Sequence, residues 1–369
     1  MRLTPFQAIY PNLDYITSPD SFFDNVKEEY NDYYASGFFN KTAQDGFFIY
    51  QITTPVRSYT GLLACVDIRD FIDGRIKKHE ETLSDKEQKQ IQLILRRKAA
   101  VKPVLLTYPR QKVIYQFLQE YTQQHPPFFE VTFEKELGLH RFWEIKDGEN
   151  IQQIQALFHQ QVPCTYIADG HHRTSSVAVL FERLQALPTA LDYSQLFCAL
   201  FPSSDVEILD YNRVVDGLSE VSLTTFMAKL SQVCEIEILD HPEKPRQKHE
   251  ITIFVNREWF KIKWNKEVLQ EFQHLPTILD TMLLNKKILQ KILGLEDARS
   301  DLRVEYVENP RGLDGLRQET LQKETNIGFC LYPVRLEELI ALADAGHTLP
   351  PKSTWFEPRM KNGLMVKDF

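Results

Sequence analysis

The sequence has few cysteines, and no two of them are spaced as Cys-x-x-Cys. A structural zinc site is therefore not expected, and the cysteines are predicted to be reduced thiols packed in the core. The chain also lacks an apolar run of the ~20 residues that a membrane-spanning helix needs. Its first residues lack the apolar segment of a signal peptide. We expect a soluble, cytoplasmic protein with no membrane partner.

The sequence also has no excess of basic over acidic residues. Lys and Arg number 43 against 51 Asp and Glu, so the formal net charge is −8. A protein that binds nucleic acid usually carries a basic face, because phosphate contacts dominate its affinity. The charge balance therefore favours a small-molecule enzyme and argues against a nucleic-acid partner.

The order of strand-like and helix-like segments predicts an α+β fold around a small mixed sheet. Strands are predicted at residues 47–53, 59–68, 104–108, 128–133, 141–145, 163–168, 195–202, 251–255, 259–264, 303–307 and 327–333. Helices are predicted at residues 22–34, 84–100, 111–124, 151–160, 174–187, 279–293 and 336–345. A charged, proline-bearing stretch at residues 240–249 predicts a boundary between an N-terminal region, 1–239, and a C-terminal α+β region, 250–369.

The segment Asp169-Gly170-His171-His172-Arg173 stands between a predicted strand and a helix that should begin near Arg173 or Thr174. Gly170 lets the backbone turn sharply or approach a ligand, and the free amides at a helix start attract anions. Arg173 adds a guanidinium fork for phosphate oxygens. The histidines can donate hydrogen bonds or transfer protons, and Asp169 can orient a histidine, accept a proton or hold a metal. An ordinary Asp-Gly turn with exposed histidines is the alternative, but the convergence of these residues predicts an anion site.

Two further clusters carry groups suited to the same chemistry. Lys78, His79 and Glu80 lie in a loop before a predicted helix, where Glu80 could serve as a general base. Taken locally, a solvated charged loop is the favoured interpretation. Near the C-terminus, Pro350 and Pro351 stiffen the chain before Lys352, Ser353 and Thr354, which could neutralise or hydrogen-bond phosphate. A rigid surface turn is an equally good interpretation of that segment.

At these clusters together the chain resembles the bacterial and archaeal family known as domain of unknown function 1015. The matching segments are residues 76–82 (Ile-Lys-Lys-His-Glu-Glu-Thr), 166–173 (Tyr-Ile-Ala-Asp-Gly-His-His-Arg) and 350–359 (Pro-Pro-Lys-Ser-Thr-Trp-Phe-Glu-Pro-Arg), with Gly363 and Leu364. They occur in the same order, and the similarity spans nearly the whole chain.

The region of about residues 60–200 also resembles the ParB/sulfiredoxin superfamily, which includes the archaeal ADP-dependent free-serine kinase. That resemblance implies a ParB/sulfiredoxin-like mixed-sheet core with helices, elaborated by N- and C-terminal additions. It implies a nucleotide site at Asp169, His171 and Arg173 and a catalytic role for Glu80. Sulfiredoxins carry their reactive cysteine where this chain has His171, so sulfiredoxin chemistry is not expected. No helix-turn-helix candidate accompanies the core, and residues 352–354 have no counterpart that we can place in the serine kinase.

The predicted function is a small-molecule phosphotransferase that uses ADP or ATP, together with Mg²⁺, to phosphorylate a hydroxyl acceptor such as free L-serine. Its predicted catalytic residues are Glu80, Asp169 and His171. The predicted phosphate- and nucleotide-binding residues are Lys78, His79, Gly170, His172, Arg173, Thr174, Lys352, Ser353 and Thr354. A nucleotide hydrolase and a nucleotide-sensing module without phosphotransfer remain as alternatives, and the sequence does not identify protein ligands for a metal.

Overall fold

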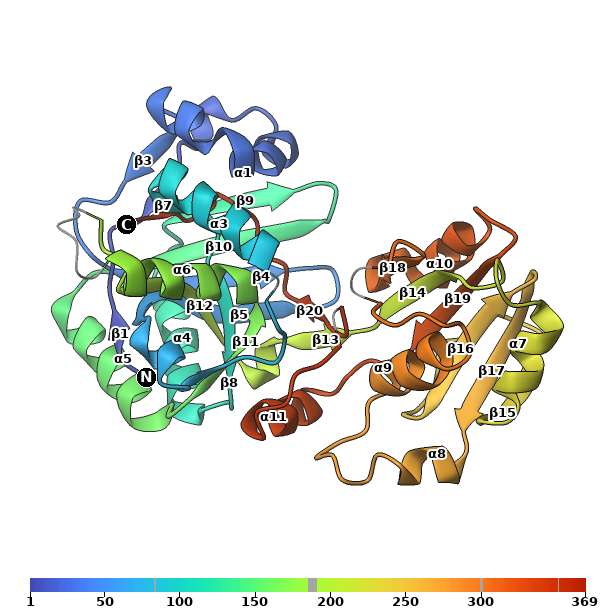
Figure 1. The fold of residues 1–369 in the computed structure, drawn as a ribbon. Coiled ribbons are helices and arrows are strands. Elements are labelled where there is room, and N and C mark those ends of the chain that lie inside the picture. Colours follow the sequence, from blue (N-terminus) through green and yellow to red (C-terminus); the bar gives the residue numbers. More distant parts are fainter. Residues whose placement is uncertain (83, 185–190, 299–300, 351) are drawn as a thin grey trace. The chain divides into compact units, whose positions relative to one another are not determined.

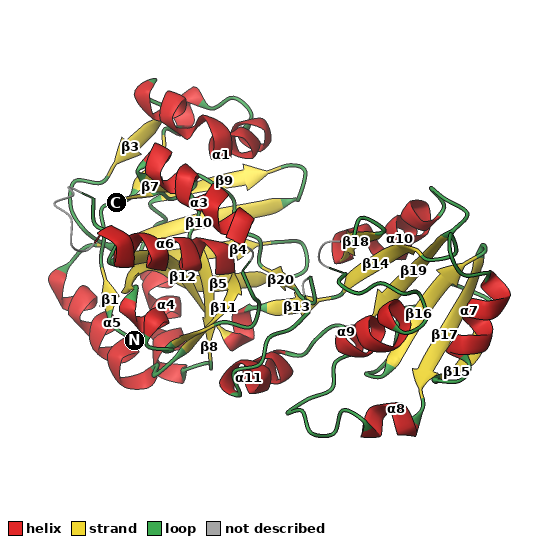
Figure 2. Cartoon of the chain, in the orientation of Figure 1, coloured by secondary structure: helices red, strands yellow, loops and turns green. Residues whose placement is uncertain are grey.

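The computed structural model describes residues 1–82, 84–184, 191–298, 301–350 and 352–369. These residues form two compact units, unit 1 (Met1–Glu207 with Pro358–Phe369) and unit 2 (Ile208–Glu357). Each unit has its own sheet with helices packed on it (Figures 1 and 2), so the fold is mixed α+β, as predicted. Among the described helices, none is both long and apolar enough to cross a membrane.

Unit 1 is built on a nine-stranded mixed sheet, which is larger than the small sheet predicted. Strands β6 and β11 are parallel, as are β8 and β12, whereas the other neighbours run antiparallel. The order across the sheet is β6 (Ile76–Lys77), β11 (Thr165–Asp169), β8 (Val104–Tyr108), β12 (Gln195–Pro202), β5 (Ser58–Asp67), β4 (Phe47–Thr53), β10 (Gly138–Ile145) and β9 (Phe129–Phe133), with β1 (Leu3–Thr4) also paired to β5.

Four helices bury this sheet through one shared hydrophobic cluster: α3 (Ser84–Arg97), α4 (Lys112–Gln124), α5 (Gly148–Gln161) and α6 (His171–Leu184). The alternation of a strand assigns side chains to the two faces. In β4, Phe47 and Ile49 join the helix-covered cluster, whereas Tyr50 lies on the opposite face. There Tyr50 stacks on Phe142 with ring centroids 4.3 Å apart. Aromatic residues therefore complete the burial of the sheet.

The chain returns to unit 1 at its C-terminal end. Val366 and Ile9 exchange backbone hydrogen bonds, and Lys361 Nζ lies 2.6 Å from Glu136 Oε1. The smaller elements of this unit are α1 (Pro19–Ala35), α2 (Arg69–Ile72), the pair β2 (Ile9–Pro11) and β3 (Phe39–Lys41), the pair β7 (Ala99–Ala100) and β21 (Lys367–Asp368), and 3-10 turns at Leu13–Tyr15 and Ser203–Asp205.

Unit 2 contains a six-stranded antiparallel sheet. Its order is β15 (Cys234–Leu239), β17 (Glu258–Trp264), β16 (Glu250–Val255), β19 (Asn326–Leu331), β14 (Tyr211–Asp216) and β18 (Val304–Glu308). Its other elements are α7 (Leu223–Leu230), α8 (Lys266–Gln270), α9 (Asp280–Leu283), a π-helix (Leu284–Gln290), a 3-10 turn (Asn309–Arg311), α10 (Gly312–Thr320), α11 (Leu336–Asp344) and the paired strands β13 (Glu207–Leu209) and β20 (Trp355–Glu357). The charged stretch 240–249, where the sequence predicts a domain boundary, connects β15 and β16 within this sheet.

Three of the predicted helices differ from the structure in extent or type. The helix predicted at 84–100 ends at Arg97, because Lys98 adopts a φ of 55° and Ala99–Ala100 form β7. The helix predicted at 279–293 is a short α-helix that continues as the π-helix. The helix predicted at 174–187 begins earlier, at His171, and residues 185–187 lie outside the described residues.

Candidate functional site

A single residue, Gly170, connects β11 to α6. Gly170 has a φ of 113°, and its carbonyl accepts the N–H of Thr174 at 3.0 Å. His171, His172 and Arg173 therefore occupy the first helical turn rather than the preceding loop, which corrects the predicted helix start. The amides of a first turn have no acceptor within the helix and carry partial positive charge. This end of α6 is thus suited to an anion.

The strand that leads into the turn is irregular. Ile167 pairs with Leu106 of β8, but Asp169 pairs with the next residue, Leu105, so Ala168 is the extra residue of a β-bulge. Bulges bend a strand and redirect its side chains, and they are common beside active sites. The bulge gives Asp169 a different orientation from the one that regular alternation would give it.

Asp169 is held among cations. Its Oδ2 lies 3.3 Å from Lys102 Nζ and accepts a hydrogen bond from Arg173 Nη2 at 3.1 Å. Burial alone would raise the pKa of Asp169, but Lys102, Arg173 and Arg359 together hold that pKa well below its usual range. Burial lowers the pKa of Lys102, and Asp169 opposes this change. One carboxylate thus faces several positive groups, which leaves an excess of positive charge around the turn.

Gly170 also makes room for Arg173. A Cβ at position 170 would lie 2.8 Å from Arg173 Nη2 and 3.1 Å from the central carbon of its guanidinium. The guanidinium is also held by Pro103, whose carbonyl accepts a hydrogen bond from Nη2 at 3.3 Å. A side chain at position 170 would therefore displace Arg173.

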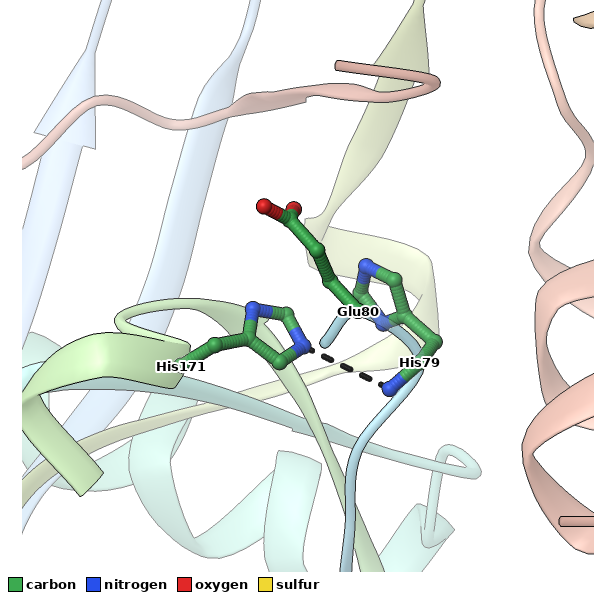
Figure 3. A group of neighbouring side chains, drawn as sticks. All are labelled: His79, Glu80 and His171. Atoms are coloured by element: carbon green, nitrogen blue, oxygen red, sulfur yellow. Dashed lines mark hydrogen bonds between the residues drawn. The ribbon is translucent and has the colours of Figure 1, made fainter. Parts of the chain in front are cut away.

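His79 and Glu80, in the loop after β6, lie next to His171 of α6 (Figure 3). The backbone N–H of His79 donates to His171 Nε2 at 3.4 Å, and the two imidazole rings meet edge to face with centroids 4.4 Å apart. Burial lowers the pKa of His171 to about 3. Burial and the neighbouring His171 ring also lower the pKa of His79 well below its usual value. Burial thus favours the neutral form of both rings, in which one imidazole nitrogen donates a hydrogen bond and the other accepts one. Because His171 Nε2 accepts, Nδ1 carries the ring proton and can donate it in a hydrogen bond.

Among the described residues, the side chains of His79, Glu80 and His171 are arranged so that they could hold a metal ion. One ligand atom from each of His79, Glu80 and His171 lies within 4.8 Å of the others. Imidazole ligands suit transition metals, whereas Mg²⁺ prefers oxygen and usually binds one or two carboxylates together with substrate phosphates. Glu80 is the oxygen donor of this group, so it is the residue of the three whose chemistry suits Mg²⁺.

The other predicted site residues have varied surroundings. Lys78 is exposed, whereas Thr174 is buried and its hydroxyl donates to the Gly170 carbonyl at 3.2 Å. Thr174 therefore supports the helix start through the hydrogen of its hydroxyl. His172 is partly buried in the first turn of α6.

The predicted segment 352–354 belongs to unit 2, whereas the turn at Gly170 belongs to unit 1. Within unit 2, Lys352 adopts a φ of 56° and its Nζ lies 5.3 Å from the ring centroid of Tyr211. The hydroxyl of Ser353 donates to the Pro350 carbonyl at 2.6 Å. Partners within the segment and its own unit thus fix its conformation.

Sequence reasoning missed Lys102 and Arg359 as members of the site. Lys102 precedes the buried strand β8, and nothing in its local sequence marks it. Arg359 is the last residue of the third segment that matches the family, residues 350–359. Its position in that segment could have indicated that it belongs to the site. Both residues act on Asp169 only because the sheet and the returning C-terminal segment bring them near it.

Solved structures with similar folds have low sequence identity to this chain. SbnI with a C-terminal truncation, from Staphylococcus aureus, is 12% identical, with a TM-score of 0.44, over 83% of this chain and 87% of that one. A free serine kinase in complex with AMP is 15% identical, with a TM-score of 0.40, over 82% and 92% of the two chains. A conserved hypothetical protein from Pyrococcus furiosus is 14% identical, with a TM-score of 0.40, over 83% and 95%.

A search of the curated proteins found no match. The scan against protein families matched residues 7–284 to one family, described as protein of unknown function (DUF1015). That match includes the loop at His79 and Glu80, the turn at Gly170 and most of both sheets. Because it covers most of the chain, this protein belongs to the DUF1015 family.

Proposed function

We propose that this protein is a nucleotide-dependent phosphotransferase that phosphorylates the hydroxyl of a small molecule. The observation that carries this proposal is the start of α6, where free amides follow Gly170 and Lys102 and Arg173 flank Asp169. Phosphoryl transfer depends on positioning and charge neutralisation more than on covalent chemistry by the protein. A helix start with an excess of cations supplies both.

In this proposal, ADP or ATP places its phosphates against the amides of α6. Arg173 and Lys102 neutralise phosphate charge, and His171 donates from Nδ1 to a phosphate oxygen. Mg²⁺ would supply further charge neutralisation on the phosphates.

Glu80 is the proposed general base. The acceptor oxygen forms a bond to the terminal phosphorus, and the bond from that phosphorus to the nucleotide oxygen breaks. The hydroxyl proton passes to Glu80, and the shortened nucleotide leaves with the electron pair of the broken bond. Free L-serine is the first acceptor to test, because the Asp-Gly-His-His-Arg turn resembles that of the free-serine kinase.

The experiment follows products by phosphorus NMR with Mg²⁺ and ADP, ATP or CTP, with and without L-serine. Phosphoserine should form with the intact protein and not with Arg173→Ala. Glu80→Gln should lower the transfer rate by about 10²–10⁴-fold while nucleotide binding persists, because general-base catalysis has about that magnitude. Glu81→Gln, a change at the exposed neighbour, is the matched control and should retain activity.

Two results would contradict this assignment. Equal loss of binding and transfer in Glu80→Gln would remove Glu80 from the role of base. Release of inorganic phosphate that L-serine does not affect would point to a nucleotide hydrolase instead.

A further inference from the structure

Unit 1 contains a second cationic feature, a pocket of about 60 Å³ between α3, α6 and the segment 99–104. Its polar wall includes Arg97, Lys102 and Arg173, and none of its described lining residues is Asp or Glu. The apolar wall is formed by Ile94, Val104, Val177, Leu196, Phe197 and Phe369. The pocket thus combines positive charge with an apolar surround.

Arg97 is the residue that most needs a partner. It is only 8% exposed, and its Nη2 donates to the carbonyl of Lys27. Its Nε is buried without a hydrogen-bond partner, and no described carboxylate forms an ion pair with it. Burial lowers the pKa of Arg97, and the carboxylate of Glu28 opposes this change only in part. Leaving a buried charge uncompensated is costly, so a bound anion would be stabilised here.

The neighbouring cations are only partly compensated. Lys102 and Arg173 share the carboxylate of Asp169, and Arg173 Nε is also buried without a partner. A water molecule requires roughly 10–15 Å³ of such space, so the pocket has room for several waters or for one small oxyanion. Guanidinium groups match carboxylate and phosphate oxygens in geometry as well as in charge.

We infer that this pocket binds a small oxyanion, the carboxylate or phosphate group of a small molecule, between Arg97, Lys102 and Arg173. Arg97 Nε and Arg173 Nε donate to its oxygens, and Lys102 supplies charge. The site requires neither Glu80 nor His171 and is centred on Arg97, although Lys102 and Arg173 border both this pocket and the proposed nucleotide-phosphate site.

The test is calorimetric titration with inorganic phosphate and, separately, with butyrate, in the absence of nucleotide. Arg97→Met should weaken binding at this site at least tenfold. Arg96→Met is the matched control, because Arg96 is the adjacent arginine, exposed, and 3.6 Å from Glu28; it should bind like the unchanged protein. The oxyanion that binds more tightly identifies whether phosphate or carboxylate is preferred.

His171→Ala separates the two sites. It should weaken nucleotide binding at the helix start and leave oxyanion binding at Arg97 intact, so either site can fail without the other. Equal oxyanion affinity in the unchanged protein and in Arg97→Met would overturn the inference.

A second measurement does not depend on how well Arg97→Met folds. Crystals of the unchanged protein soaked in selenate should show an anomalous peak beside Arg97 Nε. Selenate bound only elsewhere would overturn the inference as well.

Discussion

At the scale of single residues, Gly170 meets two requirements at once. Its φ of 113° disfavours a side chain, and a Cβ would collide with the guanidinium of Arg173. Gly74 offers a comparison, because its φ of 77° is also positive but a Cβ there would meet nothing within 4 Å. Substitutions at these two glycines therefore distinguish the effect of backbone strain from the effect of displacing Arg173.

Gly170→Ala should therefore lower the free energy of unfolding by about 1–3 kcal/mol and also weaken nucleotide binding. Gly74→Ala should lower the free energy of unfolding through backbone strain alone, and nucleotide binding should be unchanged. Chemical denaturation and calorimetric nucleotide titration measure the two effects. Unchanged nucleotide binding in Gly170→Ala would mean that the position of Arg173 does not matter for the ligand.

Buried histidines make stability depend on pH. Burial lowers the pKa of His140 to about 3, and the ring shares a hydrogen bond of 2.6 Å with the Tyr50 hydroxyl. The unfolded chain binds a proton at His140 below its ordinary pKa of 6.5, whereas the folded protein binds it only near 3. The contribution of neutral His140 to the free energy of unfolding is therefore fully present above pH 6.5, and it is lost as the pH falls toward 3.

The free energy of unfolding should fall between pH 6.5 and pH 4, and His140→Gln should flatten that dependence even though it lowers stability overall. His159→Gln, at an exposed histidine, should leave the slope unchanged. Urea unfolding at a series of pH values provides the measurement. A slope that His140→Gln does not alter would assign the pH dependence to other groups.

At the scale of elements, the contact between β5 and β12 depends on a missing side chain. A Cβ at Gly61 would lie 2.6 Å from a ring carbon of Phe201 and 2.7 Å from the carbonyl oxygen of Leu200. Gly138 in β10 has no such neighbour, because its nearest contact would be His140 Nε2 at 3.6 Å. The contact of β5 with β12 at Gly61 is thus closer than any contact that a Cβ at Gly138 of β10 would make.

Gly61→Ala should destabilise unit 1 by about 1–3 kcal/mol, as overpacking of a core usually does. Gly138→Ala should be neutral or should stabilise by about 0.5–1 kcal/mol, because it removes the entropic cost of glycine in a strand. Thermal and denaturant unfolding distinguish the two. Equal stability of the two variants would show that β12 shifts to accept the extra methyl group.

Elements were predicted well where local pattern governs them. The limits of β4 and β8 agree with the structure, because alternating or continuous apolar residues bounded by turns define them. The start of α6 was placed too late, because the sequence does not reveal that Gly170 caps the helix. Lys102 and Arg97 could not be assigned to sites from sequence, because their neighbours come from distant segments that only the folded sheet brings together.

At the scale of the whole molecule, each unit has its own sheet and hydrophobic clusters. A fragment of residues 208–357 should therefore fold alone and unfold cooperatively on heating, as followed by circular dichroism. A fragment that remains unfolded would show that unit 2 requires unit 1 for its stability.

A chain that ends at residue 357 should melt at a lower temperature in unit 1. It lacks the pairing of β21 with β7, the Ile9–Val366 bridge and the ion pair of Lys361. Lys361→Met in the full chain is the control. It removes only the ion pair with Glu136 and the contact of Lys361 with the Phe133 ring, so it should lower the melting temperature less than the shortened chain does. An unchanged melting temperature in the shortened chain would mean that these contacts do not stabilise unit 1.

The return of the chain to unit 1 has a consequence for synthesis in the cell. Unit 2 is translated between the two segments of unit 1, so the unit begun first is completed last. At about 5–20 residues per second, the ribosome needs roughly 8–30 s to add the residues of unit 2. During that interval unit 1 lacks Arg359 and β21, and its pocket lacks Phe369. A nascent chain paused within unit 2 would therefore expose incomplete apolar surface, and chaperones would have their longest access to unit 1 at that stage.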